Sequence, residues 1–166
     1  MLPELMVVDD IAAGRLRHVL AEYQALFHFT GVAIQPGKPL VFGEAKSNDR
    51  RVPFFGLPGN PVSTMVTFEL FVRPVVDVLS GGNPSAPKFL QARLKGALRT
   101  KTGLTRFLPG RLDGEGYATE VEFANWHGSG DVVSAAASNC YIVVPPDRED
   151  FTSGEMVNIL LSGARF

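Results

Sequence analysis

The chain has 166 residues, of which 45% are hydrophobic and 20% charged, so it can bury a core as one ordinary domain or two small ones. Its formal net charge of -1 gives no general attraction to nucleic acid or to an anionic membrane. No apolar run reaches the length of a membrane span, and the N-terminus lacks a signal pattern, so we expect a cytoplasmic protein. The single cysteine, Cys140, excludes an internal disulfide, and its apolar surroundings predict a buried thiol.

The first half of the sequence alternates between helix and strand patterns. Apolar residues at helical spacing predict a helix from Ile11 to Leu26, with Asp10 as its N-cap. A second helix is predicted from Pro61 to Leu79, with a kink at Pro74 because proline removes a helical hydrogen bond. The segments between them are predicted as strands at Phe27–Ile34, Leu40–Phe42 and Val52–Leu57, a turn at Gln35–Pro39 and a polar loop at Glu44–Arg51. This alternation indicates an α/β unit with a parallel or mixed sheet covered by helices.

The second half has a different pattern, which begins after a linker composition at Gly81–Pro87. Short strand-like runs follow one another between turn residues, at Phe89–Leu98, Thr105–Leu112, Tyr117–Phe123, Cys140–Val144 and Met156–Leu161. Convincing helical periodicity is missing from this half. We therefore predict two domains, an α/β domain over residues 1–82 and a small all-β domain, a sandwich or an open barrel, over residues 83–166.

The junction between the last predicted strand and the second helix has the composition of an anion-binding loop. Asn60 is a strong N-cap and Pro61 suits the first helical position, while Gly59 allows close approach of a ligand and can adopt a positive φ. The amides of Val62, Ser63 and Thr64 would then be free at the positive end of the helix dipole, with two hydroxyl groups beside them. The other interpretation is that the segment is only a well-capped helix start.

The turn at Gln35–Pro39 lies one strand pair upstream of this loop. If the intervening strands are parallel neighbours, both loops leave the sheet at the same edge, where ligands bind in open α/β folds. Lys38 would then supply a cation beside the helix start. Alternatively, Lys38 is a solvated surface lysine.

Two sequence segments together resemble a known family. Residues 32–39 read VAIQPGKP and residues 56–63 read GLPGNPVS, and their order and spacing resemble the paired signatures of the molybdopterin molybdenumtransferases, the MoeA–gephyrin family. Downstream, residues 107–112, the pair Gly128 and Ser129, and residues 151–157 resemble the C-terminal β domain of that family. The resemblance spans nearly the whole chain but covers only the second half of the family's molybdopterin-binding domain and its C-terminal domain.

The resemblance implies a role in molybdenum cofactor biosynthesis, namely insertion of molybdate into adenylylated molybdopterin with Mg²⁺ assisting, in a homodimer. It implies that Lys38 offsets charge in catalysis and that Ser129 closes the site across a dimer interface. Asp10, near the position of an acidic motif, is the candidate metal ligand. The implied substrate-binding residues are Gln35, Gly37, Pro58, Gly59, Asn60, Pro61, Val62, Ser63 and Thr64.

Three positions where the family often or usually carries a basic residue hold none here: Gly31, Gln35 and Pro109. Each departure removes positive charge from a site that should hold two anions. Together with the family segments that this sequence lacks, they favour an alternative function, a non-catalytic homologue that binds an anion or pterin or scaffolds a partner. We accordingly expect the isolated chain to be inactive in molybdenum insertion.

Overall fold

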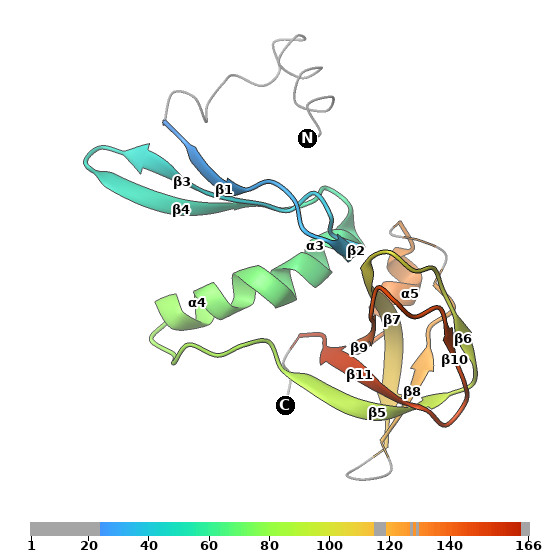
Figure 1. Ribbon diagram of the computed structural model, residues 1–166. Coiled ribbons are helices and arrows are strands. Elements are labelled where there is room, and N and C mark those ends of the chain that lie inside the picture. The colour runs from blue at the N-terminus through green and yellow to red at the C-terminus, as the bar shows by residue number, and fades with distance from the viewer. Residues whose placement is uncertain (1–23, 115–118, 127, 129, 164–166) are drawn as a thin grey trace.

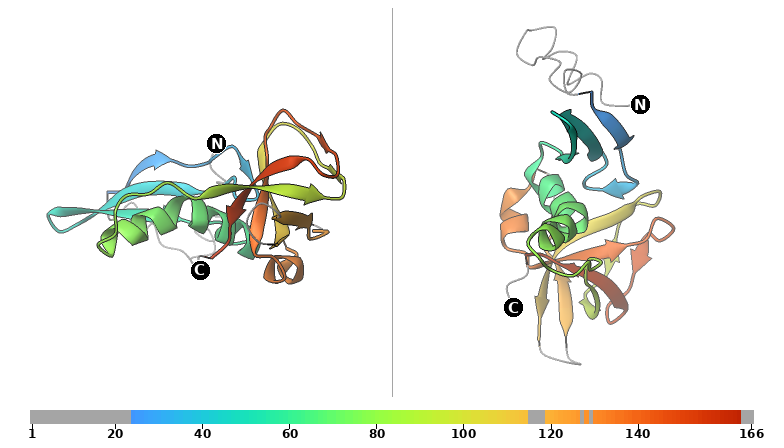
Figure 2. Two further views of the ribbon diagram at one scale, coloured as in Figure 1. Left: turned by 90° about the horizontal axis from the view of Figure 1, so that it is seen from below. Right: turned by 90° about the vertical axis from the view of Figure 1, so that its left-hand side faces the viewer.

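A computed structural model describes residues 24–114, 119–126, 128 and 130–163 (Figure 1). Its first part is a sheet in the order β1-β3-β4, made of β1 (Leu26–Phe29), β3 (Val41–Ser47) and β4 (Arg50–Gly56). The chain then forms a helical run of α3 (Pro61–Thr67), the π-helical turn η1 (Phe68–Val72) and α4 (Arg73–Leu79). This run lies alongside the sheet (Figures 1 and 2), and the start of α3 points toward the second half of the chain.

The second half is a strand-rich unit that contains one short helix. Its elements are β5 (Phe89–Lys95), β6 (Leu98–Arg99), β7 (Thr105–Asp113), β8 (Glu120–Phe123), α5 (Val132–Ala136), β9 (Cys140–Val144), β10 (Asp150–Phe151) and β11 (Met156–Leu161). The larger sheet has the order β2-β7-β8-β5-β11-β9, and an additional β7–β9 pairing closes the strands from β7 to β9 into a ring. The predicted class, an α/β unit followed by a barrel-like β unit, is confirmed.

The ring of strands encloses its own apolar core, built from alternate residues of each strand. Its fully enclosed members include Val121, Ile142 and Ile159. Cys140 belongs to the same core, where its thiol donates a hydrogen bond of 3.3 Å to the carbonyl of Gly110. Burial raises the pKa of Cys140 to about 12, so the thiol stays neutral. The predicted buried thiol is confirmed.

Two predictions in the first unit, one of a loop and one of a strand, were wrong in detail. The segment predicted as a polar loop, Glu44–Arg51, is instead a hairpin in which β3 and β4 pair up to a two-residue turn at Asn48 and Asp49. Asn48 has φ 54°, a conformation that asparagine tolerates well. Exposure to solvent explains the polar sequence of the hairpin, so polarity was misread as a loop. The strand predicted at 27–34 is also broken, because residues 30–33 separate β1 from β2 (Ile34–Gln35).

The predicted helix from Pro61 to Leu79 is confirmed as one helical run, but its irregularity precedes the predicted position. The N–H of Arg73 donates to the carbonyl of Phe68, five residues back, at the end of the π-helical turn. This wider turn ends beside Pro74, which lacks an N–H and crowds the preceding turn. Within the described part of the chain, no helix is long and apolar enough to cross a membrane.

The short helix α5 was not predicted. Asp131 caps it by accepting hydrogen bonds from the Ser134 amide at 3.0 Å and from the Ser134 hydroxyl at 2.7 Å. Five helical residues are too few to show a period of 3.6, which explains why the sequence pattern did not reveal it. Asp10 and residues 11–23 of the helix predicted at 11–26 lie outside the described residues, and Leu26, its predicted last residue, instead begins β1.

The pairing in the first sheet also differs from the expected parallel or mixed arrangement. Both described pairings of the β1-β3-β4 sheet are antiparallel; a tight turn joins β3 to β4, whereas β2, which belongs to the larger sheet, lies between β1 and β3 in the chain. The parallel pairings are β5 with β8 and β2 with β7. Since β2 precedes residue 82 and yet joins the larger sheet, the two units share a strand pairing. The domain division at residue 82 stays a prediction.

The two units also share a small apolar cluster. Val66 of α3 packs with residues from three strands of the β unit, Phe107, Tyr141 and Leu160. The side chains of Ile34, Leu70 and Val143 pack against the edge of this cluster. Helix α3 is therefore fixed on the barrel by apolar contact, and this contact positions the loop that precedes the helix.

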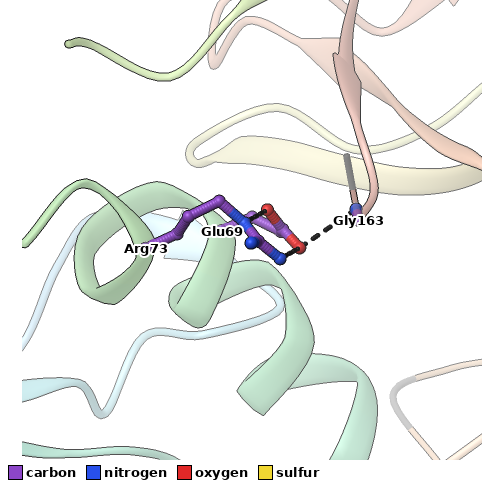
Figure 3. Close-up of polar contacts among 3 residues, drawn as sticks. All are labelled: Glu69, Arg73 and Gly163. Carbon is purple, nitrogen blue, oxygen red and sulfur yellow. Dashed lines mark hydrogen bonds and ion pairs between the residues drawn. The ribbon is translucent and has the colours of Figure 1, made fainter. Parts of the chain in front are cut away.

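A polar contact supplements the apolar cluster (Figure 3). Glu69, in the π-helical turn, accepts a hydrogen bond of 3.1 Å from the amide of Gly163, which follows β11. Arg73 holds the same carboxylate in a two-point contact, with Nε–Oε2 at 2.5 Å and Nη2–Oε1 at 2.8 Å. Glu69 is mostly buried, and its hydrogen bond raises the pKa of Arg73 above its usual range. The C-terminal end of the barrel is thus tied to the helical run.

Candidate functional site

The loop between β4 and α3 is a capped helix start, as the sequence predicts. Asn60 has extended backbone angles, φ -77° and ψ 127°, and its side-chain oxygen accepts a hydrogen bond of 3.2 Å from the amide of Val62. Pro61 occupies the first helical position. The hydroxyl of Thr64 donates toward the carbonyls of Pro58 and Asn60, the latter at 3.0 Å. These contacts fix the loop through its own side chains.

The same contacts correct part of the anion-loop hypothesis. The amide of Val62 is used by the cap, and the amide of Thr64 donates to the Asn60 carbonyl at 2.9 Å, so neither is free. Gly59 is exposed, and a Cβ built on it meets no atom within 4 Å, but it does not adopt a positive φ. Close approach to the backbone at Gly59 is therefore possible, but two of the three amides expected to be free, those of Val62 and Thr64, are engaged.

The turn after β2 packs directly against α3. Gly37 has φ 120°, and a Cβ built on it would lie 2.6 Å from Thr67 Cγ2 and 3.0 Å from Ile34 Cδ1. Only glycine allows this conformation and this approach together. Thr67 is fully buried, and its hydroxyl donates to the Ser63 carbonyl at 2.8 Å. Gly37 thus brings the turn against α3, the helix that contains the end of the second signature segment, and Lys38 next to it is exposed.

A cavity of about 370 Å³ lies where this turn, the helix start and the barrel meet. Its lining comes from both halves of the chain: Ile34, Gln35, Pro36, Gly37, Lys38, Pro39, Ser63, Leu104, Trp126 and Gly128. Residues of both signature segments line this cavity, as expected, but the contact that brings them together is not the expected one. The turn packs on α3 through Gly37 and Thr67, and Ser63 of the second segment then lines the cavity beside it, whereas two loops leaving the edge of a parallel sheet were expected.

The structure divides the predicted site residues into those that line this cavity and those that support it. Gln35, Gly37, Lys38 and Ser63 line it. The remaining predicted substrate-binding residues belong to the loop and helix start beside it: Pro58, Gly59, Asn60, Pro61, Val62 and Thr64. Ser129 and Asp10 lie outside the described residues. Gly128, which precedes Ser129, lines the cavity in the same chain as Lys38.

Two lining residues of the barrel, Leu104 and Trp126, were not predicted from the sequence. Trp126 also packs against the barrel core, and its indole N–H is buried without a hydrogen-bond partner among the described residues. The turn residues around Trp126 indicate a loop in the sequence. Only the closed barrel brings that loop to the cavity that Lys38 also lines.

Arg106, a cation that the sequence pattern did not single out, contacts one of the residues that line the cavity. Arg106 of β7 is paired in register with Gln35 of β2, and its Nη1 donates to the side-chain oxygen of Gln35. Its Nε donates to the carbonyl of Lys101 at 2.7 Å. Pro109, in contrast, is fully buried in the barrel wall, where a charged side chain would have no room.

The described residues offer no cluster of three or more histidine, cysteine, aspartate or glutamate side chains that could hold a metal ion. Asp10, the one predicted metal ligand, cannot be added because it lies outside the described part. We therefore assign no protein ligand to Mg²⁺.

Comparison with known families matches both halves of the chain. Residues 8–78 match the family described as "Probable molybdopterin binding domain". Residues 91–162 match the "MoeA C-terminal region (domain IV)". The chain belongs to the MoeA family. Both matches agree with the resemblance carried by the two signature segments, and they place the chain in molybdenum cofactor biosynthesis.

Individual relatives agree with the family assignment. A "Molybdopterin molybdenumtransferase 1" of Mycobacterium tuberculosis is 31% identical over 157 residues, which cover 92% of this chain and 36% of the relative. A "Molybdopterin molybdenumtransferase" of Haemophilus influenzae is 34% identical over 135 residues, covering 80% of this chain and 32% of the relative. A MoeA crystal structure from Pyrococcus horikoshii superposes with a TM-score of 0.70 at 30% identity, covering 89% of this chain and 34% of the other. The chain thus spans about a third of the length of these relatives.

Proposed function

We propose that this chain forms the part of a molybdopterin molybdenumtransferase that binds the anionic substrate groups at the cavity beside Lys38. The observation that carries the proposal is the meeting of the two signature segments with the barrel loop at Gly128 in one cavity. The ligand would be adenylylated molybdopterin together with molybdate, as in the reaction that the names of the relatives indicate.

The roles of the residues follow from their positions. Lys38 is exposed at the cavity and would offset the charge of a phosphate or molybdate group. The indole ring of Trp126 offers an apolar surface for the pterin. The capped loop from Pro58 to Thr64 would hold Ser63 at the cavity wall, because the contacts of Asn60 and Thr64 fix its backbone. Catalysis then rests on orientation and neutralisation of charge.

The remaining features expected of the family are part of the same proposal. They are assistance by Mg²⁺ in cleaving the nucleotide, a homodimer in which Ser129 closes the site, and a cytoplasmic location. Since Gly128 lines the cavity of its own chain, Ser129 can also act within one chain. A mixed dimer with Lys38→Gln in one subunit and Ser129→Ala in the other would distinguish the two arrangements. Action within one chain leaves no complete site, whereas action across the interface leaves one.

A second candidate function is binding without catalysis. It is favoured by the neutral side chains at Gln35 and Pro109 and by the buried position of Pro109. An insertion assay with adenylylated molybdopterin, magnesium and molybdate separates the two functions. We expect no turnover by the isolated chain and turnover once the missing family segments are supplied. Turnover comparable to a full-length enzyme would contradict the expected inactivity, whereas no turnover even with those segments would favour the binding function.

Binding itself is tested by calorimetric titration of adenylylated molybdopterin into the wild type and a Lys38→Gln variant. We expect the variant to bind about tenfold more weakly, the lower end of the 1.5–3 kcal/mol range for a hydrogen bond to a charged group, because Lys38 is exposed. The matched control is Lys46→Gln, which removes the same charge from the exposed hairpin of β3. Equal affinity of Lys38→Gln and the wild type would overturn the assignment of the site.

A further inference from the structure

Arg106 differs from the ion-paired arginines of the described residues in what its guanidinium contacts. Arg73, Arg99 and Arg148 each face a carboxylate, from Glu69, Glu149 and Glu155 respectively. Arg106 instead donates to two neutral oxygens, the side-chain oxygen of Gln35 and the carbonyl of Lys101. Among the described residues, no carboxylate forms an ion pair with it. Its positive charge is therefore not neutralised by those residues.

The two hydrogen bonds hold the guanidinium in a defined place. Arg106 and Gln35 are directly opposite in the parallel pairing of β7 with β2, so the backbone register brings the two side chains together. A guanidinium has five N–H donors, and these contacts use two of them. The remaining donors form a planar set that suits the oxygens of a tetrahedral anion.

Arg106 does not itself line the cavity that contains Lys38, but it adjoins two residues that do. Gln35, which Arg106 contacts, lines that cavity, and so does Leu104, two residues before Arg106. Lys38 therefore lines the cavity itself, and a guanidinium held by the lining residue Gln35 lies next to it. Two cations arranged in this way can bind one oxyanion from two sides.

We propose that Arg106 is an additional substrate-binding residue of this cavity, which together with Lys38 binds a tetrahedral oxyanion, and that Gln35 positions it. The oxyanion is either the phosphate of the pterin or molybdate itself, and this identification of the ligand rests on the proposed function. A neutral side chain at position 35 has a physical reason in this arrangement. Gln35 accepts a hydrogen bond from the guanidinium, whereas a lysine there would repel it.

The test uses the sole tryptophan of the chain, Trp126, which lines the cavity and serves as an internal fluorescent probe. Inorganic phosphate and molybdate are titrated separately into the wild type, and equilibrium dialysis reports the binding independently of fluorescence. The variants are Arg106→Gln, Arg106→Lys and Gln35→Ala. The matched control is Arg50→Gln, which removes the same charge at the exposed end of the β3–β4 hairpin.

We expect Arg106→Gln to weaken the binding of at least one anion about tenfold, and the anion that is affected identifies the source of the bound group. Arg106→Lys should lose less, because it keeps the charge but not the planar set of donors. The anion affinity of Gln35→Ala should lie between those of the wild type and Arg106→Gln, since this substitution frees the guanidinium without removing it. Arg50→Gln should bind both anions as the wild type does.

A purely structural role for Arg106 gives a different pattern. In that case Arg106→Gln and Gln35→Ala would lower the melting temperature alike and leave both affinities unchanged, which would overturn the inference. If Lys38→Gln still weakened binding in that experiment, the proposed function would survive. If the wild type bound neither anion by either method, the inference would also be wrong, and the calorimetric titration with adenylylated molybdopterin would decide the proposed function separately.

Discussion

The barrel encloses a core of fully buried apolar side chains, although Phe89 and Met156 of its strands are half-exposed. The β1-β3-β4 sheet, in contrast, leaves much of its apolar surface uncovered by the described residues. In the barrel, residues such as Ala92, Val121 and Ile142 have no exposed surface at all. In the sheet, Leu26 is 50% exposed and Val52 is 48% exposed. The aromatic side chains of the sheet instead stack on one another, as Phe42 and Phe55 do with ring centroids 4.7 Å apart.

The difference shows how each region obtains its stability. A closed ring of strands excludes water from its interior and leaves few strand edges, so its core depends on contacts within the ring. A three-stranded sheet covered by a helical run can bury one face only in part. The candidate cavity is lined by the turn after β2, by Ser63 of α3 and by barrel residues, so its geometry depends on how firmly the first half of the chain is held against the barrel.

The largest effect is expected from truncating a core residue of the barrel. Ile142→Ala should lower the free energy of unfolding by about 2–5 kcal/mol, because it leaves a cavity among fully buried neighbours. Phe42→Ala in the sheet should cost less, about 1–2 kcal/mol, because Phe42 is only half-buried. Urea unfolding followed by circular dichroism measures both. Equal losses of unfolding free energy in the two variants would mean that the two regions are packed equally tightly.

The second prediction compares two glycines of the signature segments. Gly37→Ala should destabilise the protein by about 1–3 kcal/mol, because the residue has a positive φ and its new Cβ would meet Thr67. Gly59→Ala should change stability by less than about 0.5 kcal/mol, because a Cβ there meets nothing. The measurement is thermal unfolding of the two variants in parallel. A harmless Gly37→Ala would show that the turn is not held against α3.

The third prediction concerns the helix cap beside the cavity. Asn60→Ala removes the acceptor of the Val62 amide and should cost about 1 kcal/mol. Asn83→Ala, in the exposed segment between the two halves, is the control and should have no measurable effect. Chemical denaturation of the two variants provides the comparison. A cost below the experimental error for Asn60→Ala would mean that the cap does not stabilise the helix start.

The smallest effect at neutral pH is expected at Cys140. Because its pKa is raised to about 12 in the folded state, the thiol should not react with a disulfide reagent at pH 8 until the chain unfolds. The sign of the pH dependence follows from the same shift. The stability that the neutral thiol contributes is complete below about pH 9, the ordinary value, and is lost as the pH rises toward about 12. Rapid labelling of the native protein would contradict the burial of Cys140.

The sequence revealed those parts of the fold and site that depend on neighbouring residues. The cap at Asn60, the proline at the first helical position and the long helical run follow from local preferences, so they were predicted correctly. The hairpin of β3 and β4 was missed because its polar residues face solvent, and α5 was missed because it is too short to show a period. The free amides expected at Val62 and Thr64 are engaged, because a well-made cap and the first helical bond use them.

By itself the sequence determined that the chain is an α/β unit followed by a β unit and that two short segments carry the family's signatures. Such features are set by side-chain chemistry over a few residues, so they can be read without coordinates. Only the tertiary structure decided that Gly37 packs on Thr67, that Trp126 lies at the cavity, and that Arg106 contacts Gln35. These contacts join residues up to 71 positions apart. They depend on strand register and on closure of the barrel, which no local pattern specifies.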